Sequence, residues 1–155
     1  MTASIRTGTG HDIESCVELW ARVIAARDGS QVIAEVTEKA RAAFEQPLVR
    51  FATVCAPPQA FALTVAKERR VAHLSRICVE PTAASRGLGT ALLADAIEHA
   101  RDAGFARISL DVRETNTRAI ALYARAGFIA VSEPWDYDGG DLLTTWSRPL
   151  QVGER

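Results

Sequence analysis

Cysteine is scarce in this 155-residue chain, and neither sign of charge dominates it. The three cysteines, Cys16, Cys55 and Cys78, are an odd number at wide, irregular spacing, which fits neither a disulfide framework nor a zinc site. Each lies in an apolar segment, so we expect buried free thiols in a reducing cytoplasm. The formal net charge of −1 gives no reason to expect nucleic acid as a partner.

Long apolar runs are also missing, and the sequence therefore predicts no bilayer span. The first residues, MTASIRTGTGHD, have no apolar core of the kind that a secretory signal needs. What is present is typical of a globular protein, with 48% apolar and 24% charged residues. We expect a single cytoplasmic domain over residues 1–155, as a monomer or homodimer, with no metal site and no membrane partner.

Strand and helix signals alternate in the first half of the chain. SIRTG is a short first strand, and Asp12 is the expected N-cap of a helix that Gly29 ends. A second helix is predicted over 32–44, before Pro47. Three strands joined by short turns follow and indicate an antiparallel meander, at 49–55, 60–66 and 71–79.

The second half continues the alternation. A helix is predicted over 87–103 with Gly104 just past its end, and a helix from Asn116 ends at Gly127. Strands are predicted before and after the second of these helices, at 106–112, 128–132 and 142–148, with the loop EPWDYDGGD joining the last two. Helices that lie between strands in this order predict a mixed α/β or α+β fold.

The stretch CVEPTAASRGLGTALL (78–93) places Gly87 and Gly89 where a strand turns into a helix. Free N–H groups and the positive dipole end of a helix attract phosphate, and glycine lets a ligand approach the backbone. A phosphate or pyrophosphate site is therefore one interpretation, and a plain turn is the other. The Walker type of loop is excluded because the stretch has no lysine before a serine or threonine.

A dinucleotide fingerprint stays open as a weaker alternative. It requires a third glycine where this chain has Leu92, and a tight turn where residues 80–86 intervene. Asp111 does lie at the end of the following strand, as a ribose-binding acid would. This alternative predicts that the protein binds NAD.

Two segments together resemble the GNAT superfamily of N-acetyltransferases: VAHLSRICVEPTAASRGLGTALL and ISLDVRETNTRAIALYARAGF. The resemblance extends over about residues 5–150. It implies a bent mixed sheet of about six to seven strands flanked by about four helices. It also implies that acetyl-CoA, as co-substrate, binds between the strand at 71–79 and the strand at 106–112.

The resemblance also implies which residues hold the cofactor. The pantetheine arm would pair with the backbone of the strand, the pyrophosphate would bind the amides of the glycine turn, and Asn116 would contact the pantetheine in addition to capping its helix. The family's first motif position is Ala84 here, so Arg86 is the residue that could supply positive charge. The full set is Ile77, Cys78, Val79, Ser85, Arg86, Gly87, Leu88, Gly89, Thr90 and Asn116.

Acetyl transfer needs a group that assists the leaving thiolate, a donor that stabilises the oxyanion and a base that takes the amine proton. Tyr123, in ALYARAGF, matches the family tyrosine that protonates or hydrogen-bonds the leaving thiolate, although helical periodicity alone fits a core tyrosine equally. A backbone N–H near residues 77–79 would stabilise the oxyanion. His73 matches a position that carries a base in some members, although a satisfied strand histidine is the alternative. Asp111 is open between a solvated residue, a salt-bridge partner and an acid facing the amine.

The acceptor is the least determined part. The resemblance places it near residues 27–31 and 133–141, and the candidate residues are Asp28, Asp111, Trp135 and Tyr137. Acids with aromatics suit a cationic amine, but an ordinary polar hairpin loop fits as well. A small-molecule amine, an antibiotic amine, an amino acid and a protein or peptide amine all stay open. So does a domain that binds acyl-CoA without catalysis, as a sensor or assembly module.

Overall fold

The computed structural model describes residues 4–28, 33–136 and 142–150, apart from the side chains of Asp28, Ile33 and Ser85. Its elements follow in the order β1 (Ile5–Thr7), α1 (Gly10–Asp28), α2 (Ile33–Ala43), β2 (Leu48–Val54), β3 (Ala60–Glu68), β4 (Val71–Val79), η1 (Pro81–Arg86), α3 (Leu88–Asp102), β5 (Arg107–Arg113), α4 (Thr117–Arg125), β6 (Ile129–Ala130), β7 (Trp135–Asp136) and β8 (Leu142–Pro149).

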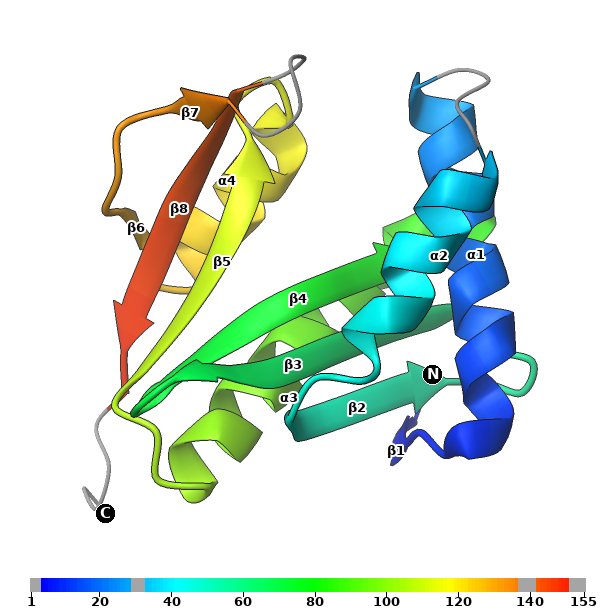
Figure 1. Cartoon of the computed structure of the whole chain (residues 1–155), viewed down its shortest axis with the longest axis horizontal. Coiled ribbons are helices and arrows are strands. Elements are labelled where there is room, and N and C mark those ends of the chain that lie inside the picture. The colour runs from blue at the N-terminus through cyan, green and yellow to red at the C-terminus, as the bar shows by residue number, and fades with distance from the viewer. Residues whose placement is uncertain (1–3, 29–32, 137–141, 151–155) are drawn as a thin grey trace.

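The strands form one eight-stranded sheet in the order β1-β2-β3-β4-β5-β8-β6, with β7 also paired to β8. All neighbours are antiparallel except β4 and β5, which run parallel because α3 crosses between them. Figure 1 shows α1 and α2 over one face of the sheet and α3 and α4 over the other. No helix of the described residues is long and apolar enough to cross a membrane.

Each face of the sheet has its own core, and side-chain size separates the two. Toward α3 the central strands present small residues, which let the helix pack closely: Ala52, Ala60, Ala62 and Ala72. Toward α1 and α2 they present large ones, Phe51, Phe61, Leu63 and Val65. Both sets come from strands that alternate sides at every residue, so the middle of β3 is buried on both faces.

β4 and β5 separate soon after they begin, and this separation places the site. Their parallel pairing covers only three residues on each strand, from Val71↔Arg107 to His73↔Ser109. Beyond that point β4 continues with β3 and β5 continues with β8, so the two halves of the sheet diverge like an open V (Figure 1). The free edge of β4 therefore faces a gap that no strand of the described residues fills.

The predicted order of elements and the mixed, bent sheet are confirmed, with helix ends within a few residues of the expected positions. The expected six to seven strands become eight because Trp135 and Asp136 form the short β7 inside the predicted loop. Asn116 is the N-cap of α4 as predicted, accepting a hydrogen bond from the Ala119 N–H at 3.2 Å.

Two expectations were wrong in detail. Asp12 does not cap α1 from outside; it lies in the first turn, where its carboxylate accepts the Thr9 N–H at 2.9 Å, as the acid of a capping box does. The Arg6 guanidinium holds the pKa of this carboxyl well below its usual range. Cys55 is exposed rather than buried, because it follows the end of β2 in a turn with φ of 68°.

Candidate active site

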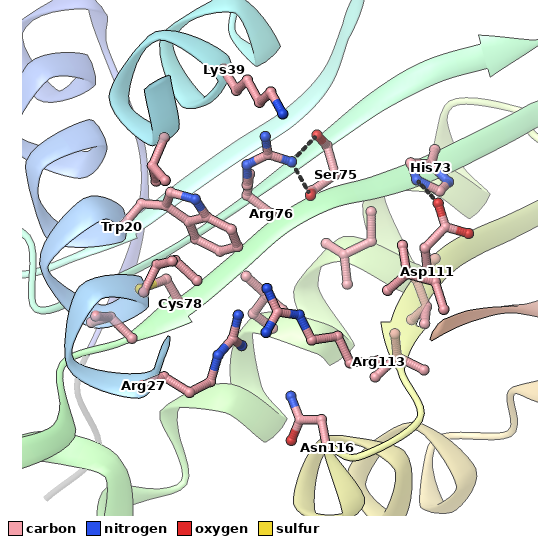
Figure 2. Close-up of a pocket in the computed structure, with 18 of the residues that line it drawn as sticks. Trp20, Arg27, Lys39, His73, Ser75, Arg76, Cys78, Asp111, Arg113 and Asn116 are labelled. Carbon is pink, nitrogen blue, oxygen red and sulfur yellow. Dashed lines mark hydrogen bonds and ion pairs between the residues drawn. The ribbon is translucent and has the colours of Figure 1, made fainter. Parts of the chain in front are cut away.

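A cavity of about 790 Å³ opens between the diverging strands, and β4, β5, α1, α2 and α4 all contribute to its walls. It brings together predicted site residues from distant parts of the sequence (Figure 2). The ones that line it are His73, Ile77, Cys78, Val79, Asp111, Asn116, Tyr123 and Trp135. Because the strands diverge, their side chains and the backbone edge of β4 share one space.

A β-bulge in β4 decides which side chains face the cavity. Leu63 pairs with Arg76 and Thr64 pairs with Leu74, so Ser75 is the extra residue. The extra residue reverses the alternation: Ile77 packs toward α3, as Leu74 does, and Cys78 joins the core under α1. A bulge of this kind bends its strand locally, here near Arg76. It re-aims the backbone groups of the last residues of β4.

The glycine turn lies between β4 and α3. Gly87 has φ 74° and ψ 17°, so it occupies the left-handed region, and it links the 3₁₀ turn η1 to the start of α3. A Cβ built on Gly87 would meet nothing within 4 Å, so the space above it is open. A Cβ on Gly89 would lie 4.0 Å from Val79 Cγ2, which puts the turn against the end of β4.

The first N–H groups of α3 have no acceptor within the helix, and its first turn contains no acidic residue. Arg86 and Thr90 are exposed beside these amides, and Leu88 is buried beneath them. The turn therefore offers an anion several backbone donors, the positive end of a helix dipole and one guanidinium. The intervening η1 is incompatible with the tight turn of a dinucleotide fingerprint.

His73 and Asp111 lie where the two strands begin to separate. His73 Nδ1 is hydrogen-bonded to Ser109 Oγ at 2.8 Å, and His73 Nε2 lies 3.5 Å from Asp111 Oδ2. Burial lowers the pKa of His73 below its ordinary value, and the Asp111 carboxylate offsets part of that shift. The imidazole is therefore neutral at pH 7, with a carboxylate placed to stabilise it if it gains a proton.

A hydrogen-bond chain holds Asp111 in place from β7 and β8. Trp135 Nε1 donates to Thr145 Oγ1 at 3.2 Å, and Thr145 Oγ1 donates to Asp111 Oδ1 at 2.7 Å. Trp135, a predicted acceptor residue, thus also positions Asp111. Of the other acceptor candidates, Asp28 is the last residue of α1, and Tyr137 lies outside the described residues.

Tyr123 lies at the border between the core and the cavity. It packs in the main core against Phe128, with ring centroids 6.0 Å apart, and it also lines the cavity from α4. Burial raises the pKa of Tyr123 to about 12. The hydroxyl therefore stays protonated across the physiological range and can act as a hydrogen-bond donor toward the cavity.

The lining also contains one tryptophan and four cations that were not named as candidate residues. Trp20 and Arg27 come from α1, Lys39 from α2, Arg76 from β4 and Arg113 from β5. The Arg76 guanidinium lies 4.9 Å from the centre of the Trp20 ring and donates to the Ser75 carbonyl at 2.9 Å. Two signals in the sequence point to members of this set: Arg27 begins the segment 27–31 expected near the acceptor, and Arg113 alternates with Asp111 on one strand.

The model of the acetyltransferase (GNAT) family matches residues 14–128. Mycothiol acetyltransferase from Salinispora tropica is 42% identical over 72 residues, which are 46% of this chain and 24% of that protein. The ribosomal protein bS18-alanine N-acetyltransferase of Escherichia coli K12 is 44% identical over 57 residues, 37% of this chain and 38% of that protein. The matched segments thus span well under half the length of these two relatives.

Solved structures share the whole fold. The PaiA N-acetyltransferase from Thermoplasma acidophilum, solved in complex with coenzyme A, superposes with a TM-score of 0.73 at 20% identity. The likeness covers 96% of this chain and 99% of that one, so the fold is shared from end to end.

Proposed function

The chain belongs to the acetyltransferase (GNAT) family, and on that basis we propose that it transfers the acetyl group of acetyl-CoA to an amine. One observation carries the proposal. β4 and β5 pair over three residues and then diverge beside a left-handed glycine at the start of a helix. That arrangement provides a free strand edge for an extended amide-bearing arm and an amide-rich turn for its pyrophosphate.

In this proposal acetyl-CoA lies along the free edge of β4. The pyrophosphate binds the amides from Ser85 to Thr90, with Arg86 beside them, and the pantetheine pairs with the backbone of Ile77 and Val79. The closeness of Gly89 to the Val79 side chain supports this path, because it places the turn beside the end of β4. Asn116, at the start of α4, lines the same cavity and is placed to contact the arm from the other side.

The reaction begins when the nitrogen lone pair of the neutral amine attacks the thioester carbonyl and forms a C–N bond. The carbonyl electrons move to oxygen, and a backbone N–H beyond the β4 bulge is placed to stabilise the oxyanion. Collapse re-forms the carbonyl and breaks the C–S bond. The sulfur leaves as thiolate, the nitrogen loses one proton, and the products are an acetamide and CoA thiol.

Tyr123 acts on the leaving thiolate as a hydrogen-bond donor. A thiol has a pKa of about 8.5, so full proton transfer from a tyrosine with a pKa of about 12 is uphill by about 5 kcal/mol. A charge-assisted hydrogen bond from the hydroxyl to the thiolate requires no proton transfer, and it stabilises the thiolate by about 1.5–3 kcal/mol. The thiolate therefore takes its proton from solvent water, and Tyr123 stabilises it by a hydrogen bond as the C–S bond breaks.

His73 and Asp111 together serve the amine. If His73 Nδ1–H donates to Ser109 Oγ, the Nε2 lone pair is available to accept the amine proton directly or through water. The imidazolium that forms is stabilised by Asp111, 3.5 Å away. The hydrogen bond from Thr145 keeps that carboxylate oriented. In this proposal His73 is both hydrogen-bonded to Ser109 within the strand pair and the base that accepts the amine proton.

An acyl-enzyme on cysteine is disfavoured. Cys78 lines the cavity, but burial raises the pKa of its thiol to about 12. At pH 7 about one thiol in a hundred thousand would be the reactive thiolate. Direct attack of the amine on acetyl-CoA is therefore the favoured route.

CoA release tests the proposal. The purified protein is incubated with acetyl-CoA and a panel of primary amines, and free thiol is measured against controls without amine and with heat-denatured protein. We expect amine-dependent release that Tyr123→Phe slows. Binding of acetyl-CoA with no release above background for any amine would instead identify a non-catalytic binder.

A further inference from the structure

Large apolar side chains stay half-buried in two walls of the cavity. Trp20 and Val23 of α1 and Val36 of α2 belong to one wall, and Trp135 of β7 and Leu143 of β8 belong to the other. Figure 1 shows these helices and strands on opposite arms of the open V. Apolar surface gathered inside a concave site is typical of a place where the apolar part of a ligand binds.

The strand wall lies directly beside the proposed base. Trp135 and Leu143 are paired across β7 and β8, so their side chains are neighbours on one face of the sheet. Thr145 is two residues further along β8 on the same face, about 6.8 Å away, and it is paired with Asp111 of β5. The Trp135 indole extends toward it, because its Nε1 donates to Thr145 Oγ1 at 3.2 Å. An apolar surface therefore begins where the carboxylate of the His73–Asp111 pair is held.

The helix wall presents a second indole. Trp20 and Val23 are three residues apart on α1, so they share one face of that helix. The Arg76 guanidinium lies 4.9 Å from the centre of the Trp20 ring, and this cation–π contact holds the ring against β4. A flat or branched apolar group that enters the cavity from the base therefore has apolar side chains available on both walls.

The charged side chains of the lining are engaged within the protein. Its four cations all interact with other groups of the chain: Arg27, Lys39, Arg76 and Arg113. Asp111 accepts a hydrogen bond from Thr145, and Glu35 is exposed on α2. Arginine and lysine whose heads are engaged line a wall with their aliphatic stems. Beyond the site for the amine itself, the described walls therefore offer an acceptor mainly apolar surface.

Because these walls flank the proposed base in one cavity, we propose that the acceptor is a small primary amine with an apolar body, aromatic or branched, on a short alkyl link. The proposal rests on the acetyl-transfer function. The amine lies at the His73–Asp111 pair, and the body packs on Trp135 and Leu143 and faces Trp20. The volume of about 790 Å³ is within the range of small-molecule sites, and the thioester arm occupies part of it. A second ammonium, as in a polyamine, would lose its hydration against these side chains.

Matched amines test the proposal in the thiol-release assay, with rates compared at equal concentrations of the neutral amine. Three pairs keep the shape and change only the polarity: butylamine and methoxyethylamine, cyclohexylmethylamine and its tetrahydropyranyl analogue, and phenylethylamine and its pyridyl analogue. We expect the apolar member of at least one pair to exceed its polar partner about tenfold or more in kcat/KM, because the polar atom gives up its hydrogen bonds with water. From ethylamine to butylamine, kcat/KM should rise about fourfold for each methylene that is buried.

Two adjacent leucines locate the effect. Leu143→Asn nearly keeps the side-chain shape, and it should reduce the ratio of kcat/KM values within the discriminating pair about fivefold or more. Leu142→Asn is the matched control, because Leu142 precedes it on β8, points to the other face, is 45% exposed and lies outside the cavity lining. A substitution that merely destabilised the fold would lower both rates and keep their ratio.

The helix wall has its own variant. Val36→Thr, which adds only polarity, should also reduce the ratio. Val131→Thr is its control, because Val131 is 52% exposed and outside the lining. An unchanged ratio in both Leu143→Asn and Val36→Thr would show that the apolar body does not bind between these walls, and it would overturn the proposal.

The other possible failures can be told apart. Polar and apolar partners that react equally would overturn the apolar subsite while acetyl transfer stood. A short peptide with an N-terminal phenylalanine that reacted tenfold better than every small amine would overturn the small-molecule acceptor and favour a polypeptide. If no amine released CoA, acetyl transfer would be wrong, and calorimetric titration with the N-acetyl products of the three pairs would decide the subsite. Tighter binding of an apolar product that Leu143→Asn abolishes and Leu142→Asn keeps would support it; equal binding within every pair, or none, would refute it.

Discussion

Gly87 and Gly104 allow the cofactor site to be tested with a built-in control. Both have positive φ, 74° and 90°, and a Cβ on either would meet nothing within 4 Å. Replacing either glycine by alanine therefore adds the same methyl group with the same kind of strain, about 1–2 kcal/mol for a left-handed non-glycine residue. The positions differ in one respect: Gly87 precedes the first amides of α3, and Gly104 follows its end.

The expected magnitudes can be calculated. For a domain of this size 1 kcal/mol shifts Tm by about 2–4 °C, so each variant alone should melt roughly 2–8 °C below the wild type. Acetyl-CoA at a hundred times the wild-type Kd should stabilise the wild type by about 2.7 kcal/mol, or roughly 5–10 °C. Gly104→Ala should keep this whole increment. If Gly87→Ala weakens binding tenfold or more, its increment falls to about 1.4 kcal/mol or less.

Thermal unfolding with and without acetyl-CoA measures both quantities, and NAD at equal concentration serves as the ligand control. Equal protection of the two alanine variants would show that the glycine turn does not hold the cofactor. Protection of the wild type by NAD and not by acetyl-CoA would refute the cofactor assignment altogether. A Gly104→Ala variant that lost protection would mean that strain at either end of α3 disturbs the site.

Three further predictions concern the chemistry. Tyr123→Phe should lower kcat about ten- to a hundredfold with little change in the KM for acetyl-CoA, and an unchanged kcat with chemistry rate-limiting would make Tyr123 a core residue only. In the wild type, kcat/KM should rise with pH along a limb below pH 6.5, because the base acts when deprotonated and burial lowers the pKa of His73. His73→Gln should abolish that limb. An unaltered pH profile in this variant would exclude His73 as the base. Cys78→Ala should keep kcat within a few-fold, whereas a loss of a thousandfold in a folded variant would favour an acyl-enzyme.

Local patterns were enough to predict most of the elements. Period-two alternation defined β5, helical periodicity and Asn116 defined α4, and glycines ended α3 and α4 near their observed positions. These signals depend on residues close together in the chain, so a single sequence expresses them. Cys55 and Asp12 were misjudged for the same reason, because their environments depend on where a strand ends and where a helix begins to within one or two residues.

The sequence by itself determined the glycine turn before α3, the tyrosine of α4 and the resemblance that joined them. Only the tertiary structure decided the rest of the site. The bulge at Ser75 reverses the alternation of β4, and pairing with β3 creates it. The cations on the wall come from α1, α2, β4 and β5, and they meet because β4 and β5 diverge. A charge acquires a function there through neighbours that are distant in sequence, and that proximity exists only in the folded chain.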